Sequence, residues 1–131
     1  MTKKTTTASI KTSTATVKRI HEKIVLLRYD KKIELETLET VQENLTALYE
    51  VGNKGYHSCL IVPSRFALPT IEGRKLIEEE LSKFPYIAVV LTGLAQKILM
   101  NFVMSVIGKT KMKIFSNEES AMDWLQKKVE D

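Results

Sequence analysis

Two short runs in which every residue is apolar constrain the fold of this chain more than any other feature. Residues 59–62 read CLIV, and residues 87–91 read IAVVL. Short apolar runs bounded by turn signals are typical of strands buried on both faces of a parallel sheet. Pro63 ends the first run, and a Thr-Gly pair follows the second. The sequence therefore predicts an α/β domain whose central strands are covered on both faces.

Segments with helical periodicity separate these strands. Residues 37–51 and a segment from Thr70 to Lys83 both repeat apolar residues at helical spacing, and Thr70 is a suitable N-cap. The residues expected to face inward are Leu38, Val41, Leu45 and Leu48 in the first helix and Ile71, Leu76, Ile77 and Leu81 in the second. The residues of the first helix expected to face away are Glu39, Gln42, Glu43 and Glu50.

The two ends of the chain complete the pattern. Residues 12–20 and 24–29 are strand-like, and the short connection between them predicts an antiparallel hairpin. Residues 112–115 (MKIF) read as a last strand, and Ser116 opens a capping-box pattern before a final helix. The apolar residues of that helix are Ala121, Trp124, Leu125 and Val129. The predicted order is ββαβαβαβα, a mostly parallel sheet with an antiparallel N-terminal edge strand.

The length of 131 residues suits one domain. Residues 1–11 are predicted to be a flexible, basic, Thr-rich tail, and residues 12–131 a single domain. Residues 1–32 hold nine Lys or Arg and two acids, but no aromatic residue precedes Tyr29, so we do not expect a nucleic-acid partner. A single cysteine and the lack of a secretory signal suggest a cytoplasmic protein.

Residues 94–107 (LAQKILMNFVMSVI) predict a helix with an unusually wide apolar surface. One side is expected to lie on the sheet: Ile98, Leu99, Phe102 and Val106. The second apolar side is our candidate interface for a homodimer or another protein: Met100, Val103, Met104 and Ile107. Residues 84–108 are long enough to suggest a membrane span, but Pro85, Lys97 and Asn101 argue against one.

Few residues suggest chemistry. His57 and Cys59 could share one face of a strand, but no third group orients them, so we predict no catalytic residue and no enzyme. Two histidines and one cysteine at no ligand spacing predict no metal and no cofactor. Lys109, Lys111 and Lys113 are interpreted as a solvated basic loop.

Several stretches resemble the STAS (SpoIIAA-like) superfamily, and more narrowly a small bacterial STAS-like family of unknown function. They are IVLLRY, the CLIV strand with its following loop and helix, IAVVLTG before the apolar helix, and KIFSNEESAMDWL. The resemblance implies a SpoIIAA-like βα superhelix. Regulatory members carry a phosphorylated serine in an Asp-Ser-Ser-Gly-like turn, which matches residues 70–73 (TIEG) here. Only Gly73 fits, and Thr70 is the single hydroxyl.

We therefore expect a non-enzymatic STAS-like interaction or regulatory domain that self-associates through residues 94–107. The alternative is a small carrier or sensor that binds a lipid or another apolar ligand. Such a pocket would be lined by Phe66, Met100, Phe102 and Met104. The loop after the CLIV strand lies where ligands bind in open α/β sheets. The candidate ligand or regulatory residues there are Ser64, Arg65, Phe66 and Thr70.

Overall fold

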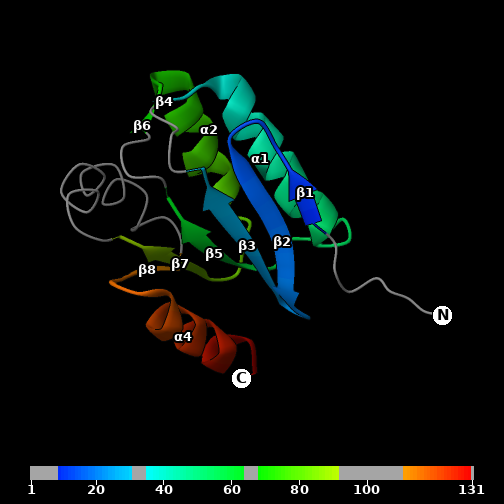
Figure 1. Ribbon diagram of the computed structural model, residues 1–131, viewed down its shortest axis with the longest axis vertical. Coiled ribbons are helices and arrows are strands. Elements are labelled where there is room, and N and C mark those ends of the chain that lie inside the picture. Colours follow the sequence, from blue (N-terminus) through cyan, green and yellow to red (C-terminus); the bar gives the residue numbers. More distant parts are fainter. Residues whose placement is uncertain (1–8, 31–34, 64–67, 92–110, 131) are drawn as a thin grey trace.

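The computed structural model describes residues 9–30, 35–63, 68–91 and 111–130, and its elements are arranged in three layers (Figure 1). The helices are α1 (Leu38–Val51), α2 (Ile71–Leu81) and α4 (Glu118–Glu130). The main sheet contains β1 (Ser9–Lys11), β2 (Ala15–His21), β3 (Ile24–Tyr29), β5 (Ser58–Val62), β7 (Ile87–Val90) and β8 (Met112–Phe115). Two further strands, β4 (Leu35–Glu36) and β6 (Leu68–Pro69), pair with each other.

The main sheet has the order β1-β2-β3-β5-β7-β8. Strands β3, β5, β7 and β8 are parallel, whereas β1, β2 and β3 pair antiparallel at the N-terminal end. The α/β fold with a mostly parallel sheet is thereby confirmed. The tail prediction was wrong for residues 9–11, because Ile10 pairs with Val17 and forms an additional edge strand. Residues 1–8 lie outside the described part of the chain.

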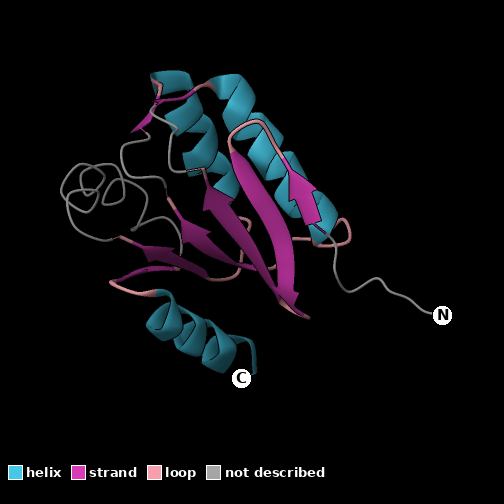
Figure 2. Cartoon of the chain, in the orientation of Figure 1, coloured by secondary structure: helices cyan, strands magenta, loops and turns pink. Residues whose placement is uncertain are grey.

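Helices α1 and α2 lie on one face of the sheet, and α4 lies on the other (Figure 2). Each of the first two helices connects neighbouring parallel strands in the same direction, and right-handed crossovers place such helices on the same face. Helix α4 follows the last strand, so no crossover fixes its side. It covers the second face of the sheet, in agreement with the prediction from the apolar runs that both faces are covered.

Alternate residues of the central strands enter two separate cores, because successive side chains of a strand point to opposite faces. The core beneath α1 and α2 includes Val25, Cys59, Ile87 and Val89 from the strands and Ala47, Leu48, Val51 and Leu81 from the helices. The core beneath α4 includes Ile24, Leu26, Leu60, Ala88 and Val90 from the strands and Ala121 and Leu125 from the helix.

The N-cap predicted for the last helix was displaced by one residue. Asn117, rather than Ser116, precedes α4, and its Oδ1 accepts a hydrogen bond from the backbone N–H of Ser120 at 2.8 Å. Asparagine and serine are both good caps, so the sequence alone did not separate them. Glu118, in the first turn of α4, forms an ion pair with Arg28 of β3 at 2.7 Å and so ties the start of the helix to the sheet.

Ile71 was predicted to face inward, but 72% of its surface is exposed. Gly73 is buried on the side of α2 that approaches α1 closely: an added Cβ would lie 3.2 Å from Val41 Cγ2, a tight contact. Two residues along a helix correspond to a rotation of about 200°. Ile71 therefore points away from α1 and into solvent.

Candidate functional site

Of the four candidate ligand or regulatory residues, the structure describes only Thr70. Ser64, Arg65 and Phe66 lie outside the described residues, as do the candidate interface residues Met100, Val103, Met104 and Ile107. Thr70 is the N-cap of α2, and its Oγ1 accepts a hydrogen bond from the backbone N–H of Gly73 at 3.1 Å. The hydroxyl that matches the STAS turn therefore has a structural role.

A backbone hydrogen bond and a short strand pair join the start of α2 to the start of α1. Glu36 of β4 pairs with Pro69 of β6, and its carbonyl oxygen accepts a hydrogen bond from the backbone N–H of Thr70 at 2.8 Å. Thr37 caps α1 at the next residue, where it forms a capping box with Thr40. The N-termini of both helices thus lie side by side at the carboxyl end of the parallel strands.

Beneath these helix starts lies a buried polar cluster formed by Thr12, Thr14, Glu36 and Asn44. Asn44 Nδ2 donates hydrogen bonds to Thr14 Oγ1 at 2.9 Å and to Glu36 Oε1 at 3.1 Å. Thr12 Oγ1 donates to Asn44 Oδ1 at 2.6 Å and accepts from the backbone N–H of Ala15 at 3.0 Å. One amide therefore joins the β1–β2 turn, β4 and α1.

The four residues of the polar cluster are shielded from water, since none is more than 7% exposed. Tyr29 lies beside it, and burial, followed by the negative charge of Glu36, raises the pKa of the Tyr29 hydroxyl well above its usual range. Within the described residues, Glu36 Oε2 is buried and has no hydrogen-bond partner. Such groups are costly to bury, so the cluster depends on the bonds that Asn44 supplies. We interpret it as a structural element that holds the N-terminal hairpin on α1.

The structure does not join His57 and Cys59 into a reactive pair. Cys59 is completely buried in β5, and burial raises the pKa of its thiol far above the ordinary value. His57 Nε2 lies 2.9 Å from the carbonyl oxygen of Gly52 and 3.2 Å from Arg19 Nη2. The imidazole and the guanidinium therefore lie at the carboxyl end of α1, where positive charge is favourable.

The buried thiol predicts a loss of stability in alkaline solution. An unfolded cysteine releases its proton near pH 8.5, while folded Cys59 keeps it, so above that pH the unfolded state binds fewer protons. The free energy of unfolding should then fall by up to about 1.4 kcal/mol per pH unit between pH 9 and 10. Urea titrations at several pH values would measure this slope. In Cys59→Ala the slope should become smaller, with a remaining part from Tyr29, whose pKa is also raised on folding. An unchanged slope would contradict the assignment to Cys59.

The most distinctive surface is a lysine–aromatic patch at the β8 edge of the sheet. It consists of Tyr86, Lys111, Lys113, Phe115, Trp124 and Lys128. Trp124 packs edge-to-face against Tyr86 at 5.9 Å between ring centroids and lies 5.6 Å from Phe115. Lys111 Nζ lies 5.1 Å from the centre of the Tyr86 ring, and Lys128 Nζ lies 5.8 Å from it. All three lysines are exposed, and no described acid forms an ion pair with them.

Sequence reasoning found only part of this patch. It noticed Lys111 and Lys113 as a basic loop, but Lys113 is within β8 and shares the α4 face of the sheet with Phe115. Trp124 was taken as core, yet it is only partly buried. The spacing of Trp124 and Lys128, one helical turn apart, was the signal that could have linked α4 to the lysines.

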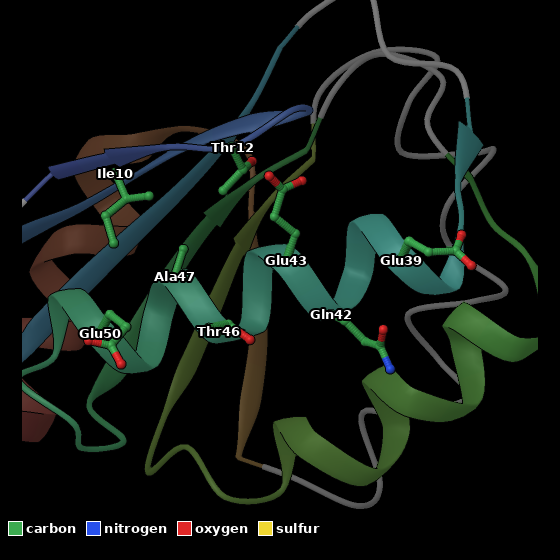
Figure 3. Close-up of a pocket in the computed structure, with 8 residues that line it drawn as sticks. All are labelled: Ile10, Thr12, Glu39, Gln42, Glu43, Thr46, Ala47 and Glu50. Carbon is green, nitrogen blue, oxygen red and sulfur yellow. The ribbon is translucent and has the colours of Figure 1, made fainter.

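A groove of about 370 Å³ lies on the opposite side of the molecule, between α1 and β1 (Figure 3). Ile10 of β1 and Ala47 of α1 provide apolar surface in this acidic groove. Its polar lining consists of Thr12, Glu39, Gln42, Glu43, Thr46 and Glu50. The predicted outward orientation of the acidic residues of α1 is confirmed, since Glu39, Glu43 and Glu50 are all exposed. Glu43 also accepts a hydrogen bond from the backbone N–H of Ser13 at 3.2 Å.

No described helix combines the length and apolar character needed to cross a lipid bilayer. Among the described residues, no three histidine, cysteine or acidic side chains are grouped as metal ligands would be.

The fold and its surfaces define a small mixed α/β domain with helices on both faces of a six-stranded sheet. Residues 18–129 match the model of the family described as "Domain of unknown function (DUF7793)", and the chain belongs to this family. The match begins within β2 and ends within α4, so it includes almost the whole described fold. No curated protein and no solved structure matches the chain.

Proposed function

We propose that this protein is a non-enzymatic interaction domain of the STAS-like kind. The observation that carries the proposal is the lysine–aromatic patch, in which three exposed ammonium groups surround partly exposed rings. Aromatic side chains supply large contact areas at protein interfaces, and lysines without acidic partners attract negatively charged surfaces. Such a surface suits docking to another macromolecule.

The placement of the reactive side chains supports the same proposal. Cys59 is buried, His57 contacts the end of α1, and Thr70 caps α2. Each of these groups contributes to the fold where it lies. The STAS-like assignment is supported by the parallel strands that follow one another in chain order and by the antiparallel hairpin that precedes them.

We further propose that the domain associates with itself through residues 94–107. The support comes from the sequence, in which Met100, Val103, Met104 and Ile107 extend the apolar surface beyond one side of a helix. Methionine side chains adapt well to such contacts. Because α4 covers the second face of the sheet in the described structure, a partner is not needed for that face. The proposed contact is therefore an additional surface.

This contact predicts that Met104→Glu weakens self-association. A buried carboxylate without a partner is costly, so the dissociation constant should rise at least about tenfold. Light scattering coupled to size-exclusion chromatography at micromolar concentrations would measure the mass against the monomer mass of 14.9 kDa. Lys97, Asn101 and Ser105 form the polar stripe of the helix predicted for the same segment. Ser105→Glu, on this stripe, is the matched control and should leave the mass unchanged. A wild-type chain that is monomeric at every concentration would refute self-association.

A further inference from the structure

We propose that the lysine–aromatic patch of one molecule binds the acidic groove of a second copy, so that the chains associate head to tail. The inference rests on the proposed interaction function and names both surfaces and the partner. It concerns only described residues and is separate from the contact proposed for residues 94–107.

The ammonium groups of the lysine–aromatic patch can bind carboxylates. Lys111 and Lys128 both lie over the ring of Tyr86, so one aromatic side chain contacts both ammonium groups. Lys128 also lies 6.0 Å from the centre of the Trp124 ring. Cation–π contacts of this kind favour the observed positions and leave the outer side of each ammonium open to an anion. A partner with acids around an apolar centre would fit this surface.

The acidic groove has that composition. Glu39, Glu43 and Glu50 recur along one stripe of α1, about one or two helical turns apart, beside the apolar surface of Ile10 and Ala47 (Figure 3). None of these three acids forms an ion pair with a described residue. The groove and the patch are therefore complementary in charge, and each combines its charges with apolar or aromatic surface.

The two surfaces lie at opposite ends of the sheet. The groove lies beside β1, the first strand in the sheet order, and the patch includes β8, the last (Figure 1). One molecule cannot bring its own groove to its own patch without unfolding the sheet. A contact between two copies therefore joins the patch of one copy to the groove of the other. The groove of the first copy and the patch of the second stay free, so further copies can bind there.

The experiment uses two full-length variants, each with one surface reversed in charge. Lys111→Glu with Lys128→Glu removes the patch, and Glu39→Lys with Glu50→Lys removes the groove. Glu43 is left intact because it binds Ser13 in the folded chain. Each variant alone should associate at least about tenfold more weakly than wild type, as measured by sedimentation velocity over a range of concentrations. An equimolar mixture of the two variants should form mixed complexes, because the intact groove of the patch variant can bind the intact patch of the groove variant.

Matched controls keep the net charge of the two variants. Lys18→Glu with Lys75→Glu, and Glu79→Lys with Glu130→Lys, change exposed residues that line neither surface and should associate like wild type. Circular dichroism spectra of all variants must match wild type for the comparison to count. Association of wild type should weaken as salt rises, because exposed charges are screened within about 8 Å at physiological ionic strength.

Three outcomes would overturn the inference. If the charge variants associate like wild type while Met104→Glu does not, the contact through residues 94–107 stands and the head-to-tail contact fails. If the mixture shows no more complex than the separate variants, the two surfaces do not bind each other. If the patch variant alone weakens association and the groove variant does not, the patch binds some other acidic surface.

Discussion

Replacing Asn44 by aspartate is expected to lower the free energy of unfolding by about 3 kcal/mol or more at neutral pH. The change keeps the size of the side chain but removes both hydrogen bonds that Nδ2 donates, to Thr14 and to Glu36. It also places a second carboxylate within hydrogen-bonding distance of Glu36 in a buried site. Like charges at that distance repel strongly where water is excluded.

The loss of stability in Asn44→Asp should shrink as the pH falls below about 5, because a protonated carboxyl can donate a hydrogen bond again. Urea unfolding at pH 7 and at pH 4.5 would measure the difference in the free energy of unfolding between the variant and wild type at each pH. Gln42→Glu makes the same amide-to-acid change on the exposed side of α1 and should alter stability by less than about 0.5 kcal/mol. Equal effects of the two substitutions would mean that Asn44 does not join the hairpin to α1.

The sequence predicted the central strands but not the polar cluster, and the reason is physical. Apolar runs and helical periodicity are local properties, so CLIV and IAVVL could be assigned from the runs alone. Asn44 lies one turn from Val41 and from Leu48 on the inward face of α1, where a polar residue looks like an exception. Its partners Thr12 and Thr14 are 32 and 30 residues away in the chain. Only the folded hairpin brings them together.

The N-terminal strand illustrates the same limit. Residues 9–11 read as part of a polar tail, and a three-residue strand carries almost no periodic signal. Ile10 becomes part of the fold because it pairs with Val17 and packs near the core beneath α1. The acidic groove depends on this strand, so the groove could not be predicted once the strand was missed.

The lysine–aromatic patch could be predicted only in part, for a topological reason. Tyr86 precedes β7, Lys113 belongs to β8, and Trp124 and Lys128 belong to α4. These segments meet because β7 pairs with β8 and because α4 returns over the second face of the sheet. The crossover rule fixes the side of a helix that connects two parallel strands, but it does not fix a helix after the last strand. Sequence therefore left the side of α4 undetermined.

The position of α4 leads to the second large expected effect. Leu125→Ala should lower the free energy of unfolding by about 2–5 kcal/mol, a substantial part of the stability of a small domain. Leu125 is fully buried and belongs to the same core as Ile24, Leu60 and Ala88. The truncation would leave a cavity between the helix and the middle of the sheet. Urea or thermal unfolding followed by circular dichroism would measure the loss.

Asp123→Ala, on the exposed side of α4, is the control and should change stability by less than about 0.5 kcal/mol. The loss in Leu125→Ala should also be the same at low and high protein concentration, because α4 of the same molecule covers the sheet. If a second copy covered that face instead, stability would depend on concentration. A loss below about 1 kcal/mol, or one that disappears at high concentration, would show that the face is buried in some other way.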